Sequence, residues 1–333
     1  RSTPLYSSAA SDVYKRQLLK SFHTADYIAV LKKTEVSQKI SEKDAKTYNI
    51  GSLSNPVFPE MFKRPATSVG SSLLAADLVA NGGRAYSLGG GLHHGMTGYA
   101  NGFCFLNDLA FAINRLRDLG VQRIAYIDLD AHHCDGVAAA FPEDENLFVV
   151  STHERKRWPF TGGLDENIPD RFLNVPLPSQ CNDTEFMFVF EKLVLPLLDR
   201  FQPEALIIQG GADALVEDPM SRLCLSNQVI FKILSILLGS SQRVLLTGGG
   251  GYNPWTVARL WTGFWALISG RTIPEVLPNQ ATELLRSLSW QRQTKPKEIM
   301  LNSIYDVPME GQLRDEVSDI VKKVSSLHKF KHS

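Results

Sequence analysis

The chain has 333 residues, of which 44% are hydrophobic and 21% are charged, a composition typical of an ordinary globular protein with a sizeable core. Its 35 basic and 35 acidic residues balance, so the overall charge does not favour non-specific binding to nucleic acid or to an anionic membrane. No apolar run approaches the roughly 20 residues that span a bilayer. The scattered cysteines form no CxxC pair, which favours a reducing, cytoplasmic compartment and argues against a disulfide framework.

Residues 1–17, "RSTPLYSSAASDVYKRQ", show no apolar periodicity and no signal-peptide layout. They look like translated adapter sequence, and we exclude them from the fold. We expect the folded domain to occupy residues 18–333.

From this point, short apolar segments alternate with helical patterns, which predicts a single α/β domain with a mostly parallel central sheet and helices on both faces. The predicted strands are 84–88, 123–129, 146–151, 204–209 and 243–247. The predicted helices are 106–119, a helix that follows a Ser226 cap and ends at Gly239, and a helix from Pro254 to Gly270.

Glycine, histidine, aspartate or tyrosine follows each of the five predicted strands. In chain order these segments read "GGGLHHG", "DAHHCDG", "THE", "GGAD" and "GGGGYN". Ligands of open α/β sheets bind outside the carboxyl ends of the strands, and glycine there lets the backbone come close. The sequence therefore predicts a functional site at this edge of the sheet.

Two carboxylates and one imidazole at this edge, from Asp130, His132 and Asp213, form a donor set that suits a catalytic zinc. Such a set leaves a fourth position for water or substrate. Asp128 and Asp135 would then accept hydrogen bonds from imidazoles and orient them. The alternative is a buried aspartate–histidine network that holds no metal.

Three more side chains at this edge suit proton transfer or charge stabilisation. His93 and His94 lie between glycines, and imidazole is the side chain best suited to proton transfer near neutral pH. The phenol of Tyr252 would stabilise negative charge on a metal-bound carbonyl. Taken alone, the histidine pair would be a solvated turn and Tyr252 a turn residue packed over glycines.

The glycine-rich segments match neither GxxxxGK[ST] nor GxGxxG, so we discount a nucleotide site. Three aromatic residues near the predicted site would line an apolar channel, although each also suits a core position: Phe103, Trp158 and Phe160.

Together, "GGGLHHG…NGFCFLND", "YIDLDAHHCDG", "STHE", "GGADAL..DPM" and "TGGGGYN" closely resemble the zinc-dependent histone deacetylase superfamily and its bacterial acetoin-utilisation branch. The resemblance runs from "FHTADY" (22–27) to at least Gly270 with the motifs in the same order and spacing. It implies the single-domain arginase/deacetylase fold, with the N-terminal part of that fold expected to be truncated here. One departure is Cys134, which stands where many relatives have glycine.

The resemblance implies that Asp130, His132 and Asp213 hold zinc, and it leaves iron as an alternative ion. It makes His94 the general base and acid. The other implied catalytic residues are His93, Tyr252, Asp128 and Asp135: His93 is hydrogen-bonded to Asp128, Asp135 orients His94, and Tyr252 polarises the acetyl carbonyl.

The resemblance also implies a lysine tunnel lined by Gly102, Phe103, Trp158 and Met220. It implies a structural monovalent cation, potassium, bound partly through backbone carbonyls at Asp128, Asp130, His132, Ser151 and Thr152.

The predicted reaction is hydrolysis of the acetyl amide of Nε-acetyl-lysine in a protein or peptide, which releases acetate and lysine. The alternatives are an acetylpolyamine deacetylase, an arginase-like ureohydrolase and a non-catalytic acetyl-lysine reader. A two-metal ureohydrolase would want a further D-x-D pair beside Asp213, and a reader would be expected to lose the base, a ligand or Tyr252. The predicted partner is the acetylated substrate, without nucleic acid or membrane, and the sequence leaves the oligomeric state open.

Overall fold

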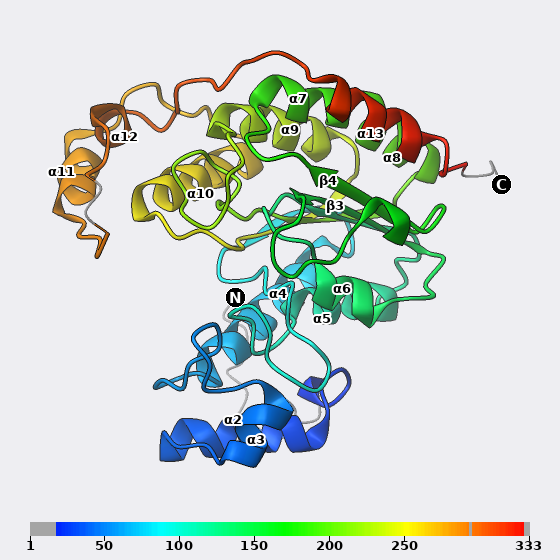
Figure 1. Ribbon diagram of the computed structural model, residues 1–333, viewed down its shortest axis with the longest axis vertical. Coiled ribbons are helices and arrows are strands. Elements are labelled where there is room, and N and C mark those ends of the chain that lie inside the picture. The colour runs from blue at the N-terminus through cyan, green and yellow to red at the C-terminus, as the bar shows by residue number, and fades with distance from the viewer. Residues whose placement is uncertain (1–17, 293–294, 330–333) are drawn as a thin grey trace.

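A six-stranded parallel sheet forms the centre of the computed structural model, which describes residues 18–292 and 295–329 (Figure 1). The sequence prediction for residues 1–17 lies outside these ranges. The strand order is β1-β6-β5-β2-β3-β4, and every pairing is parallel. The strands are β1 (Gly83–Ser87), β2 (Ile124–Asp128), β3 (Leu147–Glu154), β4 (Phe172–Leu177), β5 (Ala205–Gln209) and β6 (Arg243–Thr247). The predicted open parallel sheet is confirmed.

The sequence reading missed β4, while the other five strands lie within three residues of their predicted bounds. The sequence of β4, "FLNVPL", contains Pro176, which cannot donate to a ladder of hydrogen bonds. Proline is tolerated in a strand at the edge of a sheet, and β4 is an edge strand.

Helices cover both faces of the sheet, as predicted (Figure 1). One face carries α4 (Lys63–Val79), α5 (Asp108–Asp118) and α6 (Asp135–Ala140). The other carries α7 (Asp183–Val189), the π-helical turn η2 (Phe190–Val194), α8 (Leu195–Phe201), α9 (Asn227–Gly239), α10 (Pro254–Ile268) and α13 (Asp315–Ser325).

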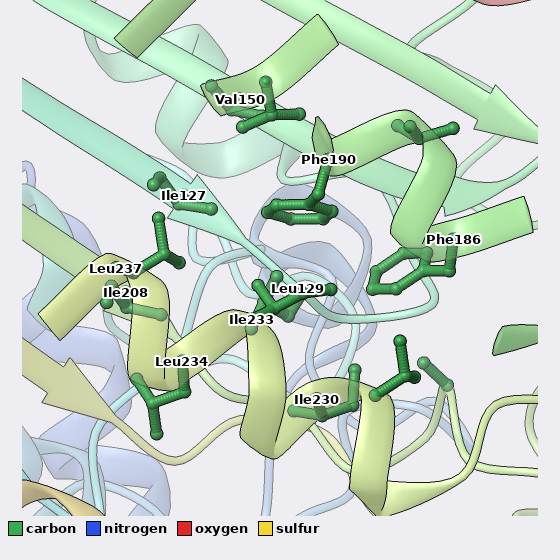
Figure 2. Close-up of a cluster of buried hydrophobic side chains, with 14 of the residues drawn as sticks. Ile127, Leu129, Val150, Phe186, Phe190, Ile208, Ile230, Ile233, Leu234 and Leu237 are labelled. Atoms are coloured by element: carbon green, nitrogen blue, oxygen red, sulfur yellow. The ribbon is translucent and has the colours of Figure 1, made fainter. Parts of the chain in front are cut away.

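Alternation along each strand produces these two layers, because successive side chains point to opposite faces. Ile127, Val150 and Ile208 pack against Phe186, Phe190 and the leucines and isoleucines of α9 (Figure 2). Their neighbours Tyr126, Val149 and Ile207 pack toward α4 and α5. The strands are therefore buried on both faces, which explains their nearly continuous apolar sequences.

The remaining elements lie outside these two layers. They are α2 (Ala25–Ser37), α3 (Glu42–Tyr48), the 3₁₀ turn η1 (Leu164–Glu166), α11 (Asn279–Ser287) and α12 (Glu298–Asn302). A separate apolar cluster that includes Tyr27, Leu31 and Met61 joins α2 to the loop before α4. Within the two described ranges, no helix combines the length and apolar character needed to cross a bilayer.

One helix start differs from the sequence expectation in its chemistry. Ser226 occupies the N-cap position of α9, but its hydroxyl makes no cap hydrogen bond. It donates instead to Oδ2 of Asp183, at 2.6 Å. A tertiary partner with a negative charge is the stronger acceptor, and it takes the hydroxyl away from the helix end.

The strand order places a topological switch between β2 and β5. From β2 the chain moves outward to β3 and β4, and it then returns to β5 on the other side of β2. At such a point the loops that follow the two strands diverge, which leaves a crevice at their carboxyl ends. The loop after β2 carries Asp130 and His132, and the loop after β5 carries Asp213.

Candidate active site

Asp130, His132 and Asp213 converge across this switch point. Nδ1 of His132 lies 3.1 Å from Oδ1 of Asp130 and 3.0 Å from Oδ2 of Asp213. One donor atom from each residue lies within 4.8 Å of the others, and all three side chains are buried. In the described part of the chain, this is the one group of three such donors that could hold a metal ion.

Backbone hydrogen bonds, rather than strand periodicity, bring these residues together. Asp130 and His132 would share a face of a strand that continued through both, but β2 ends at Asp128. In the loop, the His132 backbone N–H donates to Oδ1 of Asp130 at 3.0 Å, and the Ala131 N–H donates to Oδ1 of Asp213 at 2.9 Å. The carboxylates therefore organise the loop that presents the imidazole.

The charges in this cluster favour a cation at the shared point. Burial alone would lower the pKa of His132, but the carboxylates of Asp213 and Asp130 raise it to about 11. Burial and the Asp130 carboxylate raise the pKa of Asp213 to about 7. The pKa of Asp130 lies well below its usual range despite burial, because the imidazoles of His93 and His132 stabilise its charge. The two carboxylates thus titrate as a unit that binds positive charge.

The two oxygens of Asp130 have different surroundings: Oδ1 faces the His132 imidazole, and Oδ2 faces Gln209 and Gly250. Oδ2 accepts from the Gln209 side chain and from the Gly250 backbone N–H, both at 3.0 Å. A Cβ at Gly250 would clash with Asp213 and lie 2.8 Å from that oxygen, so glycine is required for the loop to come this close. Carboxylate and imidazole donors held in this way fit a divalent metal ion.

Two histidine–aspartate pairs lie beside the metal-binding triad. Nδ1 of His93 is 2.8 Å from Oδ2 of Asp128, and Nδ1 of His94 is 2.6 Å from Oδ1 of Asp135. The two imidazole centroids are 3.9 Å apart. With Nδ1 bound to Asp135, Nε2 is the nitrogen of His94 available for proton transfer.

The two imidazoles have opposite pKa shifts. Burial alone would lower the pKa of His93, but the carboxylates of Asp128 and Asp130 raise it to about 9. Burial and the neighbouring charge of His93 lower the pKa of His94 to about 4, against the effect of Asp135. His94 is therefore neutral near pH 7, which is the protonation state that a general base requires.

Sequence reasoning missed the polar residues that support these pairs. The Asn101 side chain donates to Oδ2 of Asp135 at 2.8 Å, and the Tyr126 hydroxyl donates to Oδ2 of Asp128. Gln209, which supports Asp130, is the last residue of β5. A polar residue at the end of an otherwise apolar strand was the available signal for Gln209, whereas Asn101 offers no such pattern.

A cavity of about 90 Å³ lies at this site, and its lining includes the triad together with His93, His94, Gly102, Phe103 and Tyr252. Burial and the Asp213 carboxylate raise the pKa of Tyr252 above its ordinary value, so the phenol remains a protonated donor. The Tyr252 ring lies 5.7 Å from that of Phe103.

The mouth of the cavity is aromatic. Gly102 has φ +50°, and a Cβ there would clash with Trp158 and lie 2.6 Å from the His94 ring. Trp158 lies 4.6 Å from the His94 centroid, and its side chain is 36% exposed, compared with 45% for Phe103. Phe160 is more exposed still. Of the predicted tunnel residues, Gly102 and Phe103 line the cavity, whereas Trp158 and Met220 do not, and neither does Phe160. The Met220 carbonyl accepts from Arg157, next to Trp158.

Three of the five residues predicted to bind a monovalent cation, Asp128, Ser151 and Thr152, lie side by side on β2 and β3. Asp128 pairs with Ser151 between β2 and β3, and the Thr152 hydroxyl donates to the Asp128 carbonyl at 3.0 Å. The Ser151 hydroxyl bonds to Nδ1 of His153 at 2.9 Å. All of these residues are buried. The ion itself stays a prediction.

Two residues of the "HHCDG" segment, His133 and Cys134, do not line the cavity. Nδ1 of His133 bonds to the Thr161 hydroxyl at 2.8 Å, and its ring lies 5.0 Å from that of His153. Cys134 packs in the apolar cluster under α5, and burial raises the pKa of its thiol well above the ordinary value. Cys134 is therefore an unreactive packing group.

This combination of an open parallel sheet and a donor triad at its switch point defines a class of α/β protein that binds a metal ion at the carboxyl edge. A family model described as "Histone deacetylase domain" matches residues 4–268. Acetoin utilization protein AcuC of Bacillus subtilis (strain 168) is 32% identical over 289 residues, 83% of this chain and 73% of that protein. AcuC of Staphylococcus aureus (strain MSSA476) is 31% identical over 323 residues, 92% of this chain and 83% of that protein.

Solved structures agree with this result. The crystal structure of an HDAC homolog complexed with SAHA has a TM-score of 0.88 at 39% identity, covering 94% of this chain and 86% of that chain. An HDAC homolog from Aquifex aeolicus has a TM-score of 0.87 at 38% identity, covering 93% and 86%. The chain therefore belongs to the histone deacetylase family and has the arginase/deacetylase fold. Membership of this family supports deacetylase activity on an acetylated substrate.

Proposed function

We propose that this protein is a zinc-dependent hydrolase of Nε-acetyl-lysine in proteins or peptides, with its deacetylase domain in residues 18–333. One observation carries the proposal: Asp130, His132 and Asp213 meet in the same small cavity as His94 and Tyr252. A ligand triad, a neutral imidazole base and a protonated phenol are the groups that amide hydrolysis requires.

Each group has a distinct task in the reaction. A zinc ion, when bound, would polarise the acetyl carbonyl and activate the attacking water. His94 removes a proton from the water at Nε2 and later returns one to the leaving amine, while Asp135 holds its Nδ1. The Tyr252 hydroxyl donates to the developing oxyanion. His93, paired with Asp128, keeps positive charge beside His94 and thereby keeps the base neutral.

The surroundings of the cavity support an acetyl-lysine substrate over an acetylpolyamine. Phe103 and Trp158 offer apolar surface to the lysine methylenes, and Met220, whose backbone carbonyl is bonded to Arg157 next to Trp158, brings no charge. A polyamine would be selected by a free carboxylate that attracts its secondary ammonium groups. The nearby candidate, Glu217, is already ion-paired with Lys297.

The test is to incubate metal-loaded protein with matched acetyl-lysine peptides and acetylpolyamines and to quantify the acetate released. We expect a higher kcat/KM for the peptides. Equal or better activity on acetylspermidine would overturn the lysine assignment. Peptide that binds but stays acetylated would indicate a reader, and manganese-activated amidine hydrolysis would indicate a ureohydrolase.

The identity of the selecting residue is tested by Met220→Glu. This variant should raise kcat/KM for acetylpolyamines and lower it for peptides, because it adds the missing carboxylate. Met220→Gln is the matched control, since it has nearly the same shape without the charge. If both variants behave alike, Met220 does not select by charge.

The metal and the second ion are tested separately. Metal analysis of protein purified without oxygen, followed by activity after loading with zinc or iron, identifies the ion that supports turnover. For the proposed potassium ion beside Asp128, we expect activity or unfolding temperature to rise with potassium concentration at constant ionic strength. No response to potassium would argue against that site.

A further inference from the structure

Asp218 is a buried carboxylate that is neither a ligand of the triad nor part of a histidine pair. It is 4% exposed. Its Oδ2 accepts from the backbone N–H groups of Tyr252, at 2.6 Å, and Asn253, at 3.2 Å. Its Oδ1 accepts from the backbone N–H of Met220, at 2.9 Å. One side chain thus joins the loop that follows β5 to the loop that follows β6.

We propose that Asp218 is a positioning residue that sets the place of the Tyr252 hydroxyl relative to the metal-binding triad. This inference rests on the proposed function, in which Tyr252 stabilises the oxyanion. It adds a residue that acts on the reaction through Tyr252 without touching the substrate.

The need for such a residue follows from the backbone before Tyr252. Residues 248–251 are four consecutive glycines, and Gly250 is required for close approach to Asp130 and Asp213. A glycine run has little conformational preference of its own, and Gly251 has φ +147°. The glycines therefore permit the approach but do not fix the direction of the residue that follows them. Two hydrogen bonds to a carboxylate, at Tyr252 and Asn253, supply that direction.

The other end of the connection is tied to the triad. The Ser221 hydroxyl donates to the carbonyl of Asp213 at 2.6 Å, and the Asn253 side chain donates to the carbonyl of Glu217 at 3.0 Å. Asp218 therefore lies in a segment that is bonded both to a predicted ligand and to the start of α10. Its negative charge near the N-terminus of this helix is also favourable.

The expected effect is large because geometry controls catalysis. Displacing a reacting or stabilising group by about 1 Å costs on the order of 10²-fold in rate. We expect Asp218→Ala to lower kcat by about this factor while metal content stays near that of the wild type. The loss should be in kcat more than in KM, since the oxyanion forms in the transition state.

A double-mutant cycle with Tyr252→Phe tests whether Asp218 acts through the hydroxyl. Residues that work as a unit are not additive. Once the hydroxyl is absent, Asp218→Ala should lower kcat by no more than a few-fold further. An equal loss in both backgrounds, or near wild-type kcat in Asp218→Ala, would overturn the proposal.

Asp183 provides a matched control. It is also buried and accepts three hydrogen bonds, from the Ser226 N–H, the Ser226 hydroxyl and the Met309 N–H. These partners lie away from the cavity. We expect Asp183→Ala to lower the unfolding temperature while kcat of the folded protein stays unchanged.

A second variant and a structural measurement complete the test. Asp218→Asn can keep its carbonyl oxygen on Tyr252 and Asn253 and lose only the Met220 bond, so it should retain most of kcat. Asp218→Ser, whose shorter side chain cannot hold the Tyr252 and Asn253 N–H groups in the same way, replaces Asp218→Ala in the cycle if that variant does not fold. A crystal structure of either variant that loses kcat, with the Tyr252 ring unmoved, would overturn the inference. Failure of the proposed function is a separate result: wild-type protein that releases no acetate, or Tyr252→Phe with wild-type rate.

Discussion

Two regions of the molecule bury carboxylates, and they do so in different ways. The C-terminal network consists of Asp183, Glu185 and Asp306 with their partners, beside a groove of about 550 Å³ whose lining includes Asp183 and Glu310. There each carboxylate meets donors within the protein: Asp183 meets backbone N–H groups, Glu185 meets Arg314, and Asp306 meets Arg259 at 2.7 Å. Its negative charges are satisfied by fixed partners.

The triad of Asp130, His132 and Asp213 also accepts hydrogen bonds from the protein, but its two carboxylates lie within 4.8 Å of each other. Two carboxylates share one imidazole, and burial together with the nearby Asp130 carboxylate raises the pKa of Asp213. The cavity beside it, about 90 Å³, is much smaller than the groove. The size of a hollow therefore does not locate the site in this molecule. The proposed site is distinguished instead by two buried carboxylates that face one imidazole.

Removing one carboxylate from the metal-binding triad should have the largest effect on metal content and turnover. We expect Asp213→Ala to lose about one equivalent of metal and essentially all turnover, because a two-ligand site holds zinc poorly. Metal analysis and acetate release measure both. The control is Asp306→Ala in the C-terminal network, which should keep its metal. Full metal content and near-normal turnover in Asp213→Ala would show that Asp213 is not a metal ligand.

The next largest effect should come from removing the Tyr252 hydroxyl, which lines the cavity. Tyr252→Phe keeps the ring and removes the hydroxyl, and loss of one oxyanion donor costs on the order of 10²–10³ in kcat. Metal binding should be unchanged. A change of only a few-fold in acetate release would mean that Tyr252 serves packing.

His23 is a buried imidazole whose partners are all backbone groups, in contrast to His132. Nε2 of His23 accepts from the Asn107 N–H, and Nδ1 donates toward the Met96 and Thr97 carbonyls. Burial lowers its pKa from 6.5 to about 4, the reverse of His132. The unfolded chain therefore binds more protons between these pH values, and stability is lost as pH falls from 6.5 toward 4. The contribution is on the order of 3 kcal/mol.

Denaturant unfolding measured across this pH range tests the prediction. The unfolding free energy of the wild type should rise with pH between 4 and 6.5, and His23→Gln should flatten that dependence by one titrating group. An unchanged slope in His23→Gln would show that His23 titrates alike in the folded and unfolded chains.

The smallest effect belongs to the C-terminal network. Arg314→Ala removes two charged hydrogen bonds from Glu185, which is fully buried, although Arg314 itself is 38% exposed. We expect a loss of about 1.5–3 kcal/mol in unfolding free energy with kcat unchanged. Lys322→Ala, which breaks the exposed pair with Asp319, should change neither quantity. A fall in kcat of folded Arg314→Ala would link the two regions.

Local chemistry in the sequence was sufficient for much of the fold and for the composition of the site. Short apolar segments alternating with helical patterns predicted the parallel sheet, and five strand ends rich in Gly, His, Asp or Tyr predicted the edge where the cavity lies. These properties are readable because strand periodicity and ligand chemistry depend on residues that are close in the chain. The metal donors named from the sequence do converge.

Tertiary structure decided what depends on pairing between distant segments. β4 was missed because its proline is acceptable only at an edge, and edge position is a property of the whole sheet. Asp213 reaches Asp130 because β5 pairs with β2 rather than with β4. Gln209, Asn101 and Asp218 gain their roles from hydrogen bonds to residues far along the chain. Such contacts have no local pattern in sequence, since their geometry exists only after the strands have assembled.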